Sequence, residues 1–177
     1  MNYATIKPID VANGPGIRVS LFVSGCTHRC KGCFNAEAWD FNFGKPFDKC
    51  AENEIFNSME HEYIEGFSLL GGEPFEPQNQ AALLPFLKEL KQRFPQKTIW
   101  CYSGYSFEDN ILAGNIGDSN ITKEMISLID VLVDGKFIEE QKDLHLRFRG
   151  SANQRIIDVQ KSLSQNETVL WDGEQYI

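Results

Sequence analysis

The sequence has 177 residues, of which 42% are hydrophobic and 24% charged, and its formal net charge is −8 at pH 7. This length and composition predict one globular domain with a buried core, and the acidic balance argues against nucleic acid as the main partner. The sequence shows neither an apolar run long enough to span a membrane nor a signal-peptide pattern at its start, so we expect a cytoplasmic protein without a membrane partner.

Short apolar runs alternate with segments of helical periodicity. In chain order, the sequence predicts a strand at 18–24, a helix at 52–64, a strand at 67–70, a helix at 78–94, a strand at 98–102, a helix at 122–129 and a strand at 131–134. Tyr63 belongs to the apolar stripe of the first helix, and Thr122 is a candidate cap for the third. Asp172-Gly173, between apolar residues, indicates a small hairpin over 169–177.

This alternation of strands and helices predicts an α/β fold with parallel strands and crossover helices. A complete eight-fold (β/α) barrel needs about 250 residues. We therefore expect a partial (β/α) barrel, shorter than the eight-fold form, in a single domain over residues 1–177. Glycine-containing segments follow the predicted strands, and such loops commonly form the site face of parallel sheets. These segments are 25–26, 71–74, 103–105 and 134–136.

Three of the five cysteines, Cys26, Cys30 and Cys33, lie in one short loop, 25–34. In a chain without an export signal, such clustering favours a metal site over disulfides. Iron–sulfur clusters are commonly held by four thiolates, so three thiolates would leave one iron of a [4Fe–4S] cluster open to a substrate. The alternative is a zinc site with His28 or a remote cysteine as its fourth ligand, although no second pair of ligands follows in the sequence.

The other two cysteines, Cys50 and Cys101, stand alone in the sequence. Free cysteine often behaves as a small hydrophobic residue, so we expect both to be buried and neither to bind the cluster. His28 lies inside the cysteine loop, where it could contact a cluster ligand or face solvent.

The spacing Cys26-x3-Cys30-x2-Cys33 after a first strand resembles the signature of the radical S-adenosylmethionine superfamily. The resemblance implies a fold of that type. It also implies that the open iron binds the amino and carboxylate groups of the methionine moiety. An electron from the cluster would then cleave the cofactor to methionine and a 5′-deoxyadenosyl radical. Many members have an aromatic residue just before the third cysteine, where this chain has Gly32, with Phe34 just after.

The stretch CTHRCKGCFN at residues 26–35 resembles the anaerobic ribonucleotide reductase-activating proteins, in which the position of Gly32 is typically glycine. The resemblance extends from the N-terminus to about residue 160, and the tail beyond it fits no motif. Similar segments in this chain are NGPGIR at 13–18, PQN at 77–79, WCYSGY at 100–105, DVLVDGKF at 130–137 and RFRGSANQ at 147–154.

The sequence Gly71-Gly72-Glu73-Pro74 matches the GGE/DP motif of the superfamily. Two glycines let the backbone approach a ligand closely, and their carbonyls can accept hydrogen bonds from the ammonium group of the methionine moiety. Glu73 adds a negative charge, which is opposite in sign to that ammonium group. The residues expected to bind S-adenosylmethionine are Gly32, Cys33, Phe34, Gly71, Gly72 and Glu73.

Five further polar or aromatic residues in these loops are weaker candidates for the cofactor site, and a structural role is equally compatible with each. Asp134 could bind a cation, the cofactor or a partner, and the loop with Arg149 and Asn153 could close over the cofactor or receive the partner. The five are Ser103, Tyr105, Asp134, Arg149 and Asn153.

The resemblance implies an oxidoreductase that activates an anaerobic (class III) ribonucleoside-triphosphate reductase by removing a hydrogen atom from one of its backbone glycines. The large subunit of that reductase is then the partner, and the family suggests a flavodoxin as reductant. No catalytic side chain is expected beyond the cluster and S-adenosylmethionine, since the cofactor carries the chemistry. The alternatives are an activase for a formate-lyase type of glycyl-radical enzyme and a zinc-binding interaction module, which the GGEP motif disfavours.

Overall fold

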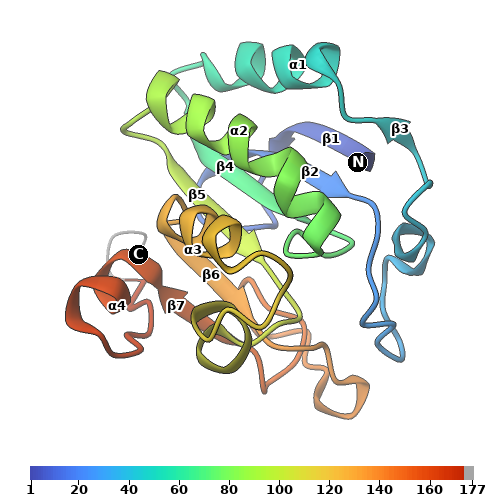
Figure 1. The fold of residues 1–177 in the computed structure, drawn as a ribbon, viewed down its shortest axis with the longest axis vertical. Helices are drawn as coiled ribbons and strands as arrows, with labels where there is room; N and C mark the ends of the chain where they lie inside the picture. Colours follow the sequence, from blue (N-terminus) through green and yellow to red (C-terminus); the bar gives the residue numbers. More distant parts are fainter. Residues whose placement is uncertain (174–177) are drawn as a thin grey trace.

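The computed structural model describes residues 1–173, which fold around a seven-stranded mixed sheet with the order β3-β1-β2-β4-β5-β6-β7 (Figure 1). The four central strands run parallel, and they are β2 (Ile17–Val23), β4 (Ile64–Gly71), β5 (Thr98–Tyr102) and β6 (Val131–Asp134). The flanking strands pair antiparallel, and they are β1 (Asn2–Asp10), β3 (Lys45–Pro46) and β7 (Arg155–Asp158).

Three helices, α1 (Lys49–Met59), α2 (Pro77–Arg93) and α3 (Ser119–Ser127), cover one face of this sheet (Figure 1). A fourth, α4 (Val159–Gln165), follows β7 at the edge. The connections contain the short helical segments η1 (Ala36–Trp39), the π-helix η2 (Phe107–Leu112) and η3 (Glu139–Gln141). Within residues 1–173, no helix combines the length and the apolarity needed to cross a bilayer.

The predicted order of four strands and three helices is confirmed, and so is the parallel pairing of those strands. The strands β1, β3 and β7 were not predicted. Most side chains of β1 are at least partly exposed, so that strand lacks the apolar run by which buried strands are recognised. The predicted hairpin over 169–177 extends beyond the described residues.

Two predicted helix boundaries are wrong. The first helix ends at Met59, and Tyr63 lies half-exposed in the turn before β4. The third helix begins at Ser119 because the carboxylate of Asp118 caps the first turn. Thr122 is not a cap, since it lies inside that helix and its buried hydroxyl donates to the side-chain carbonyl of Gln80 at 2.8 Å.

The side chains of the parallel strands alternate between two different environments. On the helix-covered face, the core is apolar and contains Leu21, Phe67, Ile99 and Leu132 together with the buried residues of the helices. The other face is covered by loops instead of helices, and its core contains Trp100, whose ring packs edge-on against Phe148. A sheet with one loop-covered face has room for a ligand beside its strands.

The guanidinium of Arg18 organises this loop-covered face from a fully buried position. Its Nε donates to the hydroxyl of Ser68 at 2.8 Å, and Nη2 donates to the carbonyls of Phe67 and Thr98, each at 2.9 Å. The Ser68 hydroxyl in turn donates to the carbonyl of Asn13 at 2.5 Å. These hydrogen bonds fasten the turn between β1 and β2 against β4 and β5.

A charged network fixes the carboxyl end of β6. Arg155 of β7 donates through Nε to Asp134 at 3.0 Å, and its two terminal nitrogens donate to Glu108 of η2 at 2.9 and 2.6 Å. Asp134 also accepts the amide of Phe107 at 2.9 Å, and the hydroxyl of Thr168 donates to Glu108. The hydrogen bonds from Arg155 are the main reason that the pKa of Glu108 falls to about 2.

This network predicts how the stability of the fold depends on pH. A carboxylate whose pKa falls from 4.5 in the unfolded chain to about 2 in the folded protein stabilises the fold above pH 4.5, and the stabilisation is lost as the pH falls toward 2. Because Glu108 is 41% exposed, solvent screening reduces its contribution to about 1 kcal/mol. Glu108→Gln should therefore lower the free energy of unfolding, measured in urea, at neutral pH and progressively less in acid.

The matched control is Glu124→Gln, which removes a carboxylate from a half-exposed ion pair with Lys88. Surface pairs of this kind contribute between zero and about 1 kcal/mol, so no comparable dependence on acidic pH is expected. A destabilisation by Glu108→Gln that stayed constant from neutral pH down to about pH 2.5 would contradict the assignment.

Candidate functional site

A cavity of about 540 Å³ lies on the loop-covered face, at the carboxyl ends of the parallel strands. Its walls come from the loops that follow β2, β4, β5 and β6, together with Ala12 and Asn13 of the turn between β1 and β2. All three clustered cysteines line it, as do Gly71, Gly72 and Glu73. The structure thus brings the cysteine loop and the GGEP loop together in one cavity.

The thiols of Cys26, Cys30 and Cys33 are free and partly buried. Burial raises the pKa of Cys26 to about 11, while the backbone amides of His28 and Arg29 donate to its sulfur and oppose that rise. Burial also raises the pKa of Cys30, against a hydrogen bond from the amide of Phe137. Amides that point at sulfur favour the thiolate, which is the form that binds iron.

The three thiols are donors of the kind that iron–sulfur clusters use. Among residues 1–173, no group of three or more His, Cys, Asp or Glu side chains is arranged to hold one metal ion. In a [4Fe–4S] cluster each thiolate binds a different iron, so the three sulfurs do not have to converge on one point. Cys26, Cys30 and Cys33 meet that looser requirement because they line a common cavity.

The buried carboxylate of Glu73 is fully engaged within the protein. Its Oε1 accepts hydrogen bonds from the Phe75 amide and the Ser103 hydroxyl, each at 2.9 Å. Its Oε2 accepts the Gly104 amide at 2.7 Å and lies 3.0 Å from Nε2 of His28. The carboxylate therefore joins the GGEP loop, the loop after β5 and the cysteine loop.

A second carboxylate, which sequence reasoning missed, anchors the same cysteine loop. Buried Glu76 accepts the amide of Thr27 at 2.7 Å and its hydroxyl at 2.5 Å. Asn79, in the first turn of α2, donates to the carbonyls of Ser24 and Glu73 at 3.0 and 2.9 Å. Two acidic residues three positions apart in a loop were the available signal for this anchoring.

The glycines of the two motifs suit the local backbone, Gly32 through its positive φ and Gly72 through a close backbone contact. Gly32 has a φ of +72°, and a Cβ at this position would lie 2.7 Å from the carboxylate of Glu139. A Cβ on Gly72 would lie 2.5 Å from the carbonyl oxygen of Gly25. An aromatic residue before the third cysteine would be strained by this positive φ, and the ring of Phe34 lies exposed at the cavity rim.

The weaker candidates divide into two groups. Ser103 and Arg149 line the cavity. Tyr105 packs behind His28, Asp134 is bound to Arg155, and Asn153 donates to the carbonyl of Lys136 at 2.8 Å, so these three are not among the lining residues.

The two isolated cysteines lie outside the cavity lining. Cys101 is fully buried on the helix-covered face, as expected, and burial raises its pKa. The prediction that Cys50 is buried is wrong, because the first turn of α1 presents it to solvent.

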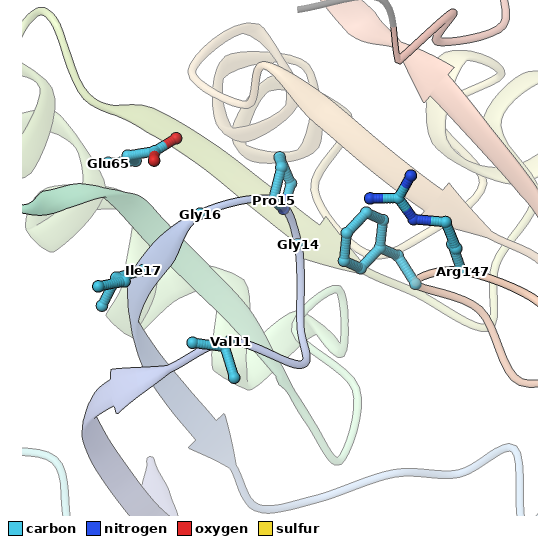
Figure 2. A pocket seen from close by; sticks show the side chains of 8 residues that line it. Val11, Gly14, Pro15, Gly16, Ile17, Glu65 and Arg147 are labelled. Atoms are coloured by element: carbon cyan, nitrogen blue, oxygen red, sulfur yellow. The ribbon is translucent and has the colours of Figure 1, made fainter. Parts of the chain in front are cut away.

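A second hollow, of about 660 Å³, lies beside the turn between β1 and β2. Figure 2 shows Glu65 and Arg147 on opposite sides of Pro15, with the backbone of Gly14 and Gly16 between them. Phe148 lines both this hollow and the cysteine-lined cavity. The two concavities are therefore neighbours, separated by the turn that Arg18 holds in place.

Comparisons with known proteins cover nearly the whole chain. The family described as "4Fe-4S single cluster domain" matches residues 12–157. The anaerobic ribonucleoside-triphosphate reductase-activating protein of Haemophilus influenzae is 45% identical, covering 88% of this chain and 97% of the relative. The proteins of the same name from Escherichia coli K12 and Enterobacteria phage T4 are 42% and 40% identical, with 88% of this chain and 97% and 93% of the relatives covered.

The hydrogen bonds of Glu73 predict a large effect of Glu73→Gln on stability. A glutamine must turn its NH2 group toward two of the four donors, and each mispaired buried group costs about 1–3 kcal/mol. We expect the free energy of unfolding in urea to fall by about 2–4 kcal/mol, whereas Glu62→Gln, at an exposed turn position, should leave it nearly unchanged. Equal stability of the two variants would contradict this role.

Proposed function

The chain belongs to the family of anaerobic ribonucleoside-triphosphate reductase-activating proteins, and on that premise we propose that it activates an anaerobic ribonucleotide reductase by reductive cleavage of S-adenosylmethionine at a [4Fe–4S] cluster. The observation that carries the proposal is the single cavity that all three cysteines share with the two glycines of the GGEP loop. The match to a 4Fe-4S domain over residues 12–157 includes every one of the residues that line this cavity.

In this proposal Cys26, Cys30 and Cys33 hold the cluster through their thiolates. When bound, the cluster and S-adenosylmethionine supply the electron and the 5′-deoxyadenosyl radical that takes a hydrogen atom from a glycine of the reductase. The products are methionine, 5′-deoxyadenosine and a glycyl radical on the partner. The protein's own residues bind, orient and enclose the reactants.

The loops around the cavity divide these tasks. Gly71 and Gly72 present backbone that a methionine ammonium can approach closely, and Ser103, Gly32 and Phe34 line other parts of the wall. Glu73 contributes a negative charge near the ammonium. Because its oxygens already accept four hydrogen bonds, we assign it mainly to holding the loops in place.

The fold and partners follow the same proposal. The four parallel strands would form the arc of a partial (β/α) barrel of the radical S-adenosylmethionine type, in one cytoplasmic domain. The protein substrate would be the large subunit of the reductase, with a flavodoxin as reductant. The names of the relatives favour this reductase over a formate-lyase type of partner, and the arrangement of the thiols disfavours a zinc module.

The first test concerns the cluster. Anaerobic reconstitution with iron and sulfide should give about four irons per chain, and dithionite with S-adenosylmethionine should then release 5′-deoxyadenosine. Replacing Cys26, Cys30 or Cys33 by alanine should abolish both, whereas Cys50→Ala, outside the cavity lining, should retain them. Tight binding of one zinc without cleavage would contradict the proposal.

The second test concerns the partner. The loaded protein, S-adenosylmethionine and a reductant should generate a glycyl doublet in the electron paramagnetic resonance spectrum of an anaerobic ribonucleotide reductase. Formate lyase under the same conditions should give no doublet. A doublet on formate lyase alone would overturn the choice of partner while leaving the cleavage chemistry intact.

A further inference from the structure

The side chain of His28 points inward from the middle of the Cys26–Cys30 segment. Only 6% of this side chain is exposed. Its Nε2 lies 3.0 Å from Oε2 of Glu73, a carboxylate oxygen that can only accept when ionised, so Nε2 carries the proton and donates it. Nε2 of the imidazole is thus used in the hydrogen bond to Glu73 and is not free to bind iron.

The imidazole borders the cysteine-lined cavity and packs against the loop after β5. The ring of Tyr105 packs edge-on against it, with 4.4 Å between the ring centroids. A Cβ at Gly104 would lie 2.4 Å from Cδ2 of the imidazole, so the absence of a side chain at Gly104 makes room for the ring. The loop after β5 therefore forms a fitted socket for His28.

The segment around His28 needs such support. Arg29 adopts a φ of +48°, in the left-handed region that residues with a side chain rarely occupy. The backbone amides of His28 and Arg29 lie near the sulfur of Cys26 and lower its pKa. A shift of the backbone at His28 would move these amides relative to the sulfur of Cys26.

We propose that His28 is a positioning residue whose imidazole latches the Cys26–Cys30 segment to Glu73 and thereby arranges the thiols before the cluster is inserted. The inference rests on the proposed cluster site. The latch is the hydrogen bond between His28 and Glu73, which lie on two loops that only folding brings together. The imidazole acts through the geometry of the thiols and takes no part in the reaction.

Three variants of the full-length apoprotein separate the hydrogen bond from simple packing. His28→Gln keeps an amide donor, His28→Phe keeps a ring without a donor, and His28→Ala removes both. His61→Ala is the matched control, because His61 stacks on Tyr63 in an exposed turn. The measurements are amide hydrogen exchange of residues 27–33 without iron, the rate of iron and sulfide loading, and the thermal unfolding temperature.

In His28→Ala and His28→Phe, we expect the amide hydrogens of residues 27–33 to exchange about tenfold faster, while exchange in the central strands stays unchanged. Both variants should take up iron and sulfide about threefold more slowly. His28→Gln should restore most of both properties, and His61→Ala should match the wild type. Wild-type exchange and loading in His28→Ala and His28→Phe would overturn the proposal. So would a loss in all three variants that extends to the central strands, since the ring would then only stabilise the fold.

These readouts are independent of the proposed activity. The exchange measurement needs neither cluster nor S-adenosylmethionine, so a wild-type protein that loads iron without cleaving the cofactor would refute the reaction and leave the latch standing. A wild type that cleaves S-adenosylmethionine while all His28 variants load and exchange normally would refute the latch and leave the reaction standing.

Discussion

The burial of one carboxylate, that of Glu73, determines how the loops around the cavity are arranged. A buried charge is costly unless hydrogen bonds compensate for its lost hydration, and here four donors do so. Because those donors belong to three different loops, the loops must meet wherever the carboxylate is satisfied. The position of the cysteine loop relative to the sheet is a consequence of this requirement.

The two faces of the sheet have different structural roles. The helix-covered face is a continuous apolar core, which supplies most of the hydrophobic stabilisation. On the other face, the alternate positions of the same strands hold polar groups such as Arg18 and Ser68, which fasten loops by hydrogen bonds. Loops held at fixed points leave a space between them that packed helices would fill, and the cavity is that space.

Sequence periodicity predicts the buried half of this architecture well. The strands 98–102 and 131–134 have the predicted bounds because each contains a short apolar run with a polar residue at one end. The sequence does not predict strand β1, because pairing with β2 determines its conformation more than its own side chains do. The cysteine and glycine motifs indicate the cavity, but the partners of Glu73 do not follow from sequence, since His28 and Ser103 lie 45 and 30 positions away and meet it only in the folded chain.

The contacts of the cysteine loop also have a consequence for biosynthesis. The amide that lowers the pKa of Cys30 belongs to Phe137, and the carboxylate beside Gly32 belongs to Glu139, so both come from a segment made long after the cysteines. A nascent chain that ends before β6 contains all three thiols but lacks this part of their surroundings. The ribosome therefore completes the three thiols before the segment that encloses them.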